Sequence, residues 1–184
     1  DGVIDDYDKM PIGFCDIPEI TYGFGGAIEW KGFDVSIFFQ GTARVSLFEE
    51  GSTIVPFSSG YKNNDGFLRG VMENRWTVDN PDPNARYPRT IRPSDALDNN
   101  NTKKSSFWVR NAAFLRLKNA EIGYTFPKRW MEKMAIQNLR LYVSGVNLLT
   151  WAPDVHLFDP DLGSGDGRKY PPTRVFNVGL NINF

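Results

Sequence analysis

Cysteine and histidine are almost absent from this chain, which has one of each among 184 residues. The single thiol, Cys15, cannot form a disulfide within the chain, and His156 has no second histidine or cysteine near it in the sequence. A nucleophile elbow and a phosphate-binding glycine loop are also missing. The acidic pair Asp159 and Asp161 is of the residue type that glycosidases use, but sequence does not give the distance between two carboxyl groups. These residues argue against an enzyme, and none is predicted to be catalytic.

Long apolar runs and an excess of charge of one sign are absent as well. No stretch reaches the roughly 18 consecutive apolar residues that indicate a membrane-spanning helix. Lys and Arg total 21 against 22 for Asp and Glu, which leaves a net charge of −1. This balance does not indicate a nucleic-acid partner, and none is predicted.

Aromatic residues are plentiful, at 14% of the chain, with 14 Phe and 5 Trp. Two kinds of protein need such a content. Membrane proteins built from strands place aromatic girdles at the two bilayer interfaces, and carbohydrate-binding domains present aromatic rings on a surface.

The stretch 174–184 is the clearest strand in the sequence, because apolar and polar residues alternate in it without a slip. Its length suits a tilted strand that crosses a bilayer, which needs about 9 to 11 residues. One apolar face and one amide-rich face fit a barrel wall between lipid and a polar interior. The last strand of a soluble sandwich would show the same alternation. The apolar residues are Phe176, Val178, Leu180, Ile182 and Phe184.

A hairpin is predicted over 20–41, with a two-residue turn at Lys31 and Gly32. This turn pairs Trp30 with Phe33, and it places Phe38 opposite Gly25. Further strands are predicted over 113–126 and 139–150, and a short helix over 128–136. In the strand 113–126, uninterrupted alternation places Phe114, Arg116 and Lys118 on the apolar face, and Leu115 and Leu117 on the polar face.

The connections between the predicted strands are alternately short and long, a pattern that cannot be recognised from one strand alone. They are short at 31–32 and 127–138, and long at 42–106 and 151–173. Outer-membrane barrels alternate short periplasmic turns with long external loops in this way. The sequence therefore predicts an all-β fold, an antiparallel transmembrane β-barrel segment of about five strands. Its external loops are predicted at about 1–19, 42–106 and 151–173. The alternative is a soluble, carbohydrate-binding β-sandwich, which would bury the apolar faces between two sheets.

The first eight residues, D-G-V-I-D-D-Y-D, match the back half of an EF-hand-like calcium loop. Asp1, Asp5 and Asp8 are the candidate ligands for a calcium ion. An acidic surface turn that binds nothing is the alternative. Asp159, Asp161 and Asp166 form a second acidic group, for which a solvated loop is favoured over a cation site.

Several stretches together resemble the C-terminal part of the SusC/RagA family of TonB-linked outer-membrane transporters of Bacteroidetes. They cover nearly the whole chain, in order. The stretches are D-G-V-I-D-D-Y-D-K-M-P-I-G at 1–13, P-E-I-T-Y-G-F-G at 18–25, W-K-G-F-D-V-S-I-F-F-Q-G at 30–41, N-R-W-T at 74–77, A-R-Y-P-R at 85–89, A-F-L-R-L-K-N-A-E-I-G-Y-T-F-P at 113–127, L-R-L-Y-V-S-G-V-N-L-L-T-W at 139–151 and the terminal N-V-G-L-N-I-N-F.

The resemblance implies a plugged barrel of about 22 strands in the bacterial outer membrane. It implies energy from the TonB complex, a SusD-like surface lipoprotein as lid, and import of oligosaccharides or peptides. It also implies that Asp1, Asp5 and Asp8 belong to a calcium loop whose first ligands precede Asp1, and that no cofactor is required. In such barrels the assembly machinery recognises the terminal strand, here Phe176, Val178, Leu180, Ile182 and Phe184. Five strands cannot close a barrel, so the chain is expected to be a fragment without the plug domain.

Overall fold

The computed structural model describes residues 2, 6–51, 54–55, 68–90, 101, 103–131, 135–165 and 167–184. The chain divides into two compact units, each built from separate stretches. The first unit comprises Asp1–Ile17, Arg44–Ala112 and Asp154–Lys169, and the second comprises Pro18–Ala43, Ala113–Pro153 and Tyr170–Phe184.

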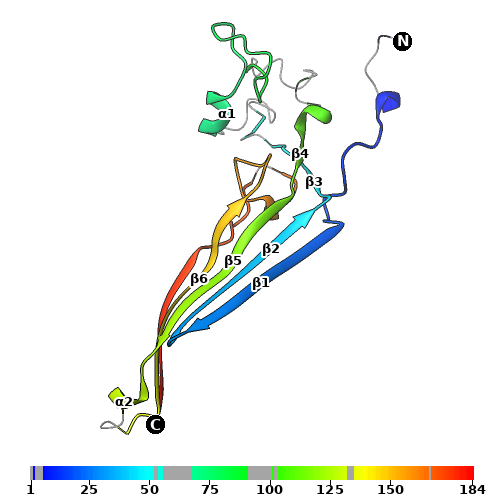
Figure 1. The fold of residues 1–184 in the computed structure, drawn as a ribbon. Coiled ribbons are helices and arrows are strands. Elements are labelled where there is room, and N and C mark those ends of the chain that lie inside the picture. The colour runs from blue at the N-terminus through cyan, green and yellow to red at the C-terminus, as the bar shows by residue number, and fades with distance from the viewer. Residues whose placement is uncertain are drawn as a thin grey trace. The chain divides into compact units, whose positions relative to one another are not determined.

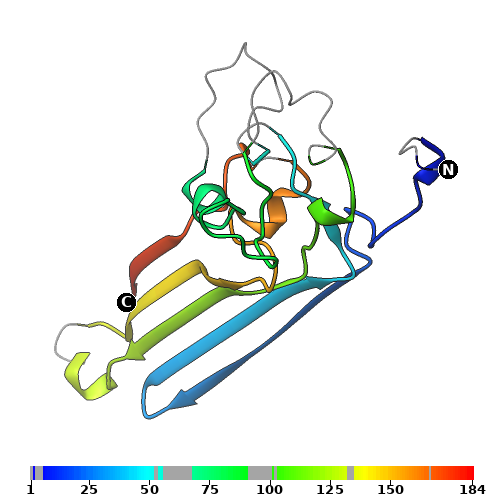
Figure 2. The same ribbon diagram turned by 90° about the horizontal axis from the view of Figure 1, so that it is seen from above.

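The second unit is one antiparallel sheet of five strands, in the order β1-β2-β5-β6-β7 (Figures 1 and 2). Each strand pairs with the next one in that order along most of its length. The predicted all-β, antiparallel class is therefore confirmed. The strands are β1 (Ile20–Trp30), β2 (Phe33–Ala43), β5 (Phe114–Thr125), β6 (Asn138–Trp151) and β7 (Val175–Asn183).

The β1–β2 hairpin has the predicted register. Trp30 pairs with Phe33, and Gly25 pairs with Phe38. The two turn residues, Lys31 and Gly32, both have positive φ angles, of 49° and 89°. Two left-handed residues in a row are the requirement of a type I′ turn, whose twist matches that of the flanking strands. Lys31 occupies this position although Asn, Asp or Gly is preferred there.

A bulge at Lys118 changes which face the first half of β5 presents. Phe38 pairs with Asn119 but Phe39 pairs with Leu117, so Lys118 is the extra residue. Because an extra residue moves every side chain before it to the other face, Leu115 and Leu117 lie on the apolar face. The prediction that Phe114, Arg116 and Lys118 continue the apolar face was wrong.

The bulge moves Arg116 to the polar face, where its side chain is almost fully buried. Its Nε donates to Thr150 Oγ1 at 2.9 Å, and its guanidinium lies 4.9 Å from the centre of the Phe114 ring. The pairing of β5 with β6 shifts at the same place, and Asn147 adopts a φ of 55°. This irregularity explains why the sequence alternation fades after Gly145.

A short helix, α2 (Lys128–Met131), follows β5, where a helix was predicted over 128–136. Residues 132–134 of that predicted helix lie outside the described residues, and the prediction was wrong at its end, because Ala135, with a φ of 54°, is not helical. Among the described helices, none is long and apolar enough to cross a membrane.

The first unit has regular structure and a core of its own, although 42–106 was predicted to lack periodic structure. Its strands β3 (Ser46–Phe48) and β4 (Val109–Asn111) form a two-stranded antiparallel sheet. One buried cluster consists of Ile54, Val55, Val71, Tyr87 and Trp108, and the other of Val45, Leu47, Ala112 and Val155. The remaining elements are η1 (Asp6–Asp8), α1 (Arg69–Glu73), η5 (Ser106–Trp108) and η7 (Pro160–Leu162).

Candidate functional site

One face of the five-stranded sheet is apolar and exposed. Its central row takes one side chain from each strand in register. In the order β1, β2, β5, β6 and β7, these side chains are 68%, 37%, 53%, 45% and 75% exposed. Phe24, Ile37 and Leu180 of neighbouring rows are exposed too. A soluble sandwich would bury these side chains against a second sheet, which no described residue of the sheet unit does. The row is Ile28, Val35, Ile122, Val143 and Val178.

Aromatic side chains bound this apolar face at both ends. At the end with the short turns, ring centroids lie 4.6, 5.0 and 6.1 Å apart along the series Phe33, Tyr124, Phe126 and Trp130. We name these residues and Trp30 the turn-end belt. At the other end, Phe39 lies 5.2 Å from Phe24 and 6.4 Å from Trp151. We name these three residues and Tyr22 the opposite belt.

The length of the apolar face matches that of a bilayer interior. The strands β1 and β2 have 11 residues each. Eleven residues rise about 35 Å, and a tilt of about 40° reduces this to roughly 27 Å, close to the apolar band of about 25 Å in outer-membrane barrels.

The polar face carries an ion cluster that joins three strands. Arg140 Nε donates to Asp34 Oδ1 at 3.0 Å and its Nη2 to Glu121 Oε1 at 2.7 Å. Gly123 lies beneath the cluster, and a Cβ there would lie 2.5 Å from Arg140 Nη2 and 2.7 Å from the Asp34 carboxylate. A side chain at position 123 would therefore displace the ends of the Arg140 and Asp34 side chains. Alternation along the strands places all three charged residues on the polar face, but it does not pair them.

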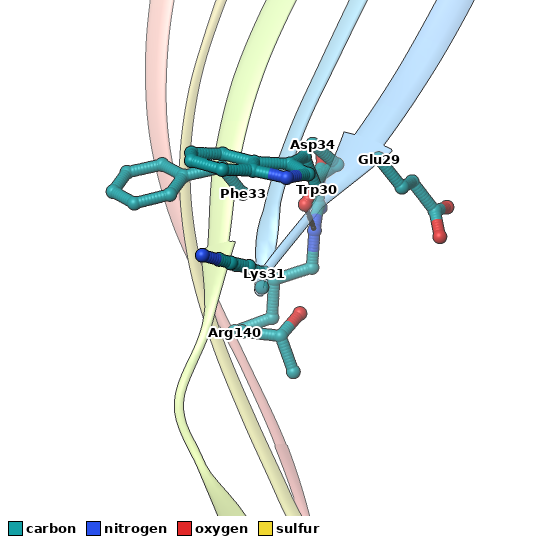
Figure 3. Close-up of a pocket in the computed structure, with 8 residues that line it drawn as sticks. Glu29, Trp30, Lys31, Phe33, Asp34 and Arg140 are labelled. Atoms are coloured by element: carbon teal, nitrogen blue, oxygen red, sulfur yellow. Dashed lines mark hydrogen bonds and ion pairs between the residues drawn. The ribbon is translucent and has the colours of Figure 1, made fainter.

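An open pocket of about 600 Å³ lies beside this cluster, at the turn end of the sheet (Figure 3). Glu29, Asp34 and Arg140 line it together with the β1–β2 turn. Figure 3 shows the Lys31 side chain on the same side as the Trp30 ring and Glu29 on the other side. The pocket therefore combines charges of both signs with aromatic walls.

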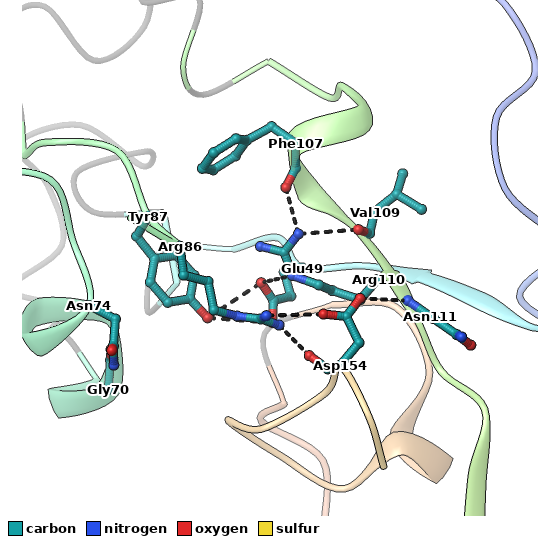
Figure 4. A network of polar contacts seen from close by, with 10 residues as sticks. All are labelled: Glu49, Gly70, Asn74, Arg86, Tyr87, Phe107, Val109, Arg110, Asn111 and Asp154. Carbon is teal, nitrogen blue, oxygen red and sulfur yellow. Dashed lines mark hydrogen bonds and ion pairs between the residues drawn. The ribbon is translucent and has the colours of Figure 1, made fainter. Parts of the chain in front are cut away.

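A second polar network lies inside the first unit (Figure 4). The side chain of Glu49 is fully buried, and Arg110 Nε donates to its Oε2 at 2.9 Å. Arg86 Nη2 lies 3.5 Å from the other carboxylate oxygen, and Tyr87 donates its hydroxyl to Glu49 at 3.4 Å. Arg86 Nη1 also pairs with Asp154 Oδ1 at 3.0 Å. The two carboxylates and two guanidinium groups balance each other in charge and join four positions that are far apart in the sequence.

Burial and hydrogen bonds shift two pKa values in this network. Burial alone would raise the pKa of Asp154, but the backbone N–H of Asn111 at 2.9 Å and the Arg86 guanidinium hold that pKa below its usual 3.8. Burial and the Glu49 carboxylate raise the pKa of Tyr87 above 10.0. Asp154 is therefore ionised and Tyr87 protonated at neutral pH. Sequence reasoning missed this network, because no local pattern indicates contacts between Glu49, Arg86 and Arg110.

The predicted metal ligands are described only in part. Asp1 and Asp5 lie outside the described residues, and Asp8 is an exposed residue of η1. Within the described ranges, no group of three or more His, Cys, Asp or Glu side chains is placed to hold a metal ion. Asp159 accepts a hydrogen bond from the backbone of Asp161 at 3.0 Å and so caps η7, while Asp166 is outside the description. The calcium loop stays a prediction.

The residues predicted to direct barrel assembly all lie on the apolar face of β7 or follow it, and all are exposed. Their role in assembly also stays a prediction. They are Phe176, Val178, Leu180, Ile182 and Phe184.

The fold and the sequence place this chain among proteins of a known class. No family model matches the sequence. The chain is similar over its whole length to bacterial TonB-dependent receptors, and it spans less than a fifth of their length. The predicted resemblance to TonB-linked transporters of the SusC/RagA type is thereby confirmed.

The individual relatives come from one bacterium, Formosa agariphila. TonB-dependent receptor P26 is 29% identical, with 100% of this chain and 19% of the receptor covered, and receptor P3 is 30% identical, with 100% and 18% covered. Among solved structures, the RagAB peptide importer in its closed-closed state has a TM-score of 0.72 at 23% identity, with 100% of this chain and 19% of that chain covered. The RagAB peptide transporter has a TM-score of 0.66 at 24% identity, with 94% and 18% covered. The likeness to RagAB shows a shared fold.

Proposed function

We propose that this chain is part of the wall and external loops of an outer-membrane active transporter that imports nutrients. The observation that carries the proposal is the exposed apolar face, bounded at both ends by aromatic belts. Full burial of one Val, Leu, Ile or Phe side chain is worth roughly 1.5–3 kcal/mol, so five strands of such side chains in water would be a strong liability. Contact with lipid removes the free-energy cost of exposing these apolar side chains to water.

The finer architecture follows from the same face. β1 and β7 are the outer strands of the described sheet, and an unpaired strand edge is unstable in a bilayer. We expect further strands of the whole protein to pair with both edges and to close a barrel of about 22 strands around a plug domain. The polar face, with Asp34, Glu121 and Arg140, then faces the plug or the lumen.

The partners belong to the same proposal. A SusD-like surface lipoprotein covers the external loops at about 1–19, 42–106 and 151–173, and the TonB complex supplies energy. The cargo is an oligosaccharide or a peptide; the names of the RagAB structures support the peptide. No covalent chemistry is assigned to any residue, and calcium at Asp1, Asp5 and Asp8 is an optional structural ion.

Site-directed labelling of the whole protein in vesicles tests the orientation of the sheet. In a background in which Cys15 and every other cysteine of the whole protein are replaced by Ser, Val178→Cys and Asn177→Cys place a fluorophore on opposite faces of β7. Lipids that carry a quencher should quench the label at position 178 and spare the label at position 177. Equal quenching at both positions, or stronger quenching at 177, contradicts the proposal. Loss of growth on oligosaccharides or on peptides after gene deletion then identifies the cargo class.

A further inference from the structure

We propose that the turn-end belt, with the cations Lys31, Lys128 and Arg129, binds the head groups of anionic phospholipids. This inference rests on the proposed function, in which the apolar face contacts lipid. It adds a preference for one chemical class of lipid at one end of the wall.

The first cation is held at the apolar side by the β1–β2 turn. Lys31 Nζ lies 4.7 Å from the centre of the Trp30 ring. Figure 3 shows its side chain on the same side as that ring, with Glu29 on the other side. Lys31 has a positive φ, as the first residue of the two-residue turn. An ammonium group is therefore placed beside an exposed tryptophan, at the edge of the face that meets lipid.

The other two cations are brought to the same end by the start of α2. Gly32 O accepts from Thr125 N at 2.7 Å, which ties the turn to the end of β5, and α2 begins three residues later. Trp130 N donates to Pro127 O at 3.0 Å and so closes the first turn of this helix. Lys128, Arg129 and Trp130 are all exposed. The aromatic series from Phe33 to Trp130 runs between the two cationic sites.

The charges at this end favour an anionic ligand. None of the three cations forms an ion pair with a described residue. The carboxylates of Asp34 and Glu121 are engaged by Arg140 on the polar face. Glu132 and Lys133, which follow α2 outside the described residues, cancel in formal charge. The turn end of the sheet thus carries three cations that no described carboxylate neutralises through an ion pair.

The two rows of the apolar face that hold the opposite belt carry no cation, although Arg44 follows β2 directly and Arg174 precedes β7. The two rows of the apolar face at that end consist of Tyr22, Gly41, Leu115 and Trp151, and of Phe24, Phe39, Leu117 and Leu149. No Lys or Arg is among them. Tryptophan beside a basic residue is the combination that anchors proteins at a phospholipid interface. A phospholipid contacts both the cations and the aromatic rings, whereas free phosphate contacts only the cations.

Lipid titration of the whole transporter in detergent, followed by native mass spectrometry, tests the proposal. Wild-type protein should bind phosphatidylglycerol more tightly than phosphatidylcholine. The triple variant Lys31→Gln, Lys128→Gln and Arg129→Gln should lose this preference, by about fivefold for each cation removed. A control variant with Lys9→Gln, Lys103→Gln and Arg174→Gln removes the same charge elsewhere and should keep the preference. Arginine in place of Lys31 and Lys128 should keep it too.

Three outcomes overturn the proposal: no preference in the wild type, a preference that survives in the triple variant, or displacement of the lipid by inorganic phosphate alone. Heat-dependent gel mobility confirms that each variant is folded. The labels at positions 177 and 178 separate this inference from the proposed function. Selective quenching at 178 without a phosphatidylglycerol preference removes only the lipid inference, and loss of selective quenching removes both.

Discussion

Val143→Arg tests whether the apolar face of the sheet contacts lipid, as proposed. Val143 is the fourth of the five residues of the central apolar row, between Ile122 and Val178, and is 45% exposed. At the midplane of a bilayer, Arg on the lipid face of a barrel costs about 2–4 kcal/mol. In water, the same substitution at an exposed strand position costs within about 0.5 kcal/mol. The two environments therefore predict clearly different stabilities for one variant.

The assay is refolding of the whole protein into phospholipid vesicles at increasing urea, read by heat-dependent gel mobility. Val143→Arg should reduce the folding equilibrium constant roughly 30- to 900-fold. The matched control is Ser144→Arg, which places the same side chain on the polar face, in register with Glu121 and Asn177. The control should lose little stability. If both variants stay within about 0.5 kcal/mol of the wild type, the apolar row does not face lipid.

Three further predictions concern the polar network and the polar face. Glu49→Ala leaves the buried Arg110 without its carboxylate partner and should destabilise the first unit by about 3–5 kcal/mol. Hydrogen exchange at β3 and β4 should become faster, and unchanged exchange contradicts this prediction. The pKa of Asp154 is below 3.8, so its contribution to stability is present above pH 3.8 and is lost as the pH falls through the lower, folded value. Acid titration of the first unit's exchange rates should show this loss, and Asp154→Asn should remove it. Gly179→Ala places a Cβ against the ring of Tyr142 and should cost about 1–3 kcal/mol in the refolding assay. Tyr142→Ala in the same protein should relieve this cost, and an additive loss in the double variant argues against this contact.

Period-2 alternation and turn chemistry were enough to predict the sheet. The hairpin register followed from the apolar set on each side of Lys31 and Gly32, because a two-residue turn leaves one way to align the two sets. The strand β7 followed from its alternation alone. Such patterns work where each strand has one apolar and one polar face along its whole length.

The bulge at Lys118 was missed because alternation shows it only indirectly. Leu115 and Leu117 fell on the polar face in the uninterrupted pattern, and the structure resolves this conflict with one extra residue. Two leucines out of phase with the alternation, on either side of an arginine, indicate a bulge in this strand. They do not indicate which residue is the extra one. The partners of Glu49 and Asp34 were missed for another reason. They come from stretches that are distant in sequence, and residue types alone do not pair distant charges.

The Glu49 network makes two stretches of the first unit depend on each other for their charge partners. The carboxylate of Glu49, the guanidinium groups of Arg86 and Arg110, and Asp154 come from 44–112 and from 154–169, and each charge is matched only when all four are present. Exchange of one stretch between relatives with different networks therefore removes the partner of the partly buried Arg86 or Asp154. Chimeric proteins should be more stable when both stretches come from the same parent than when the two stretches are mixed.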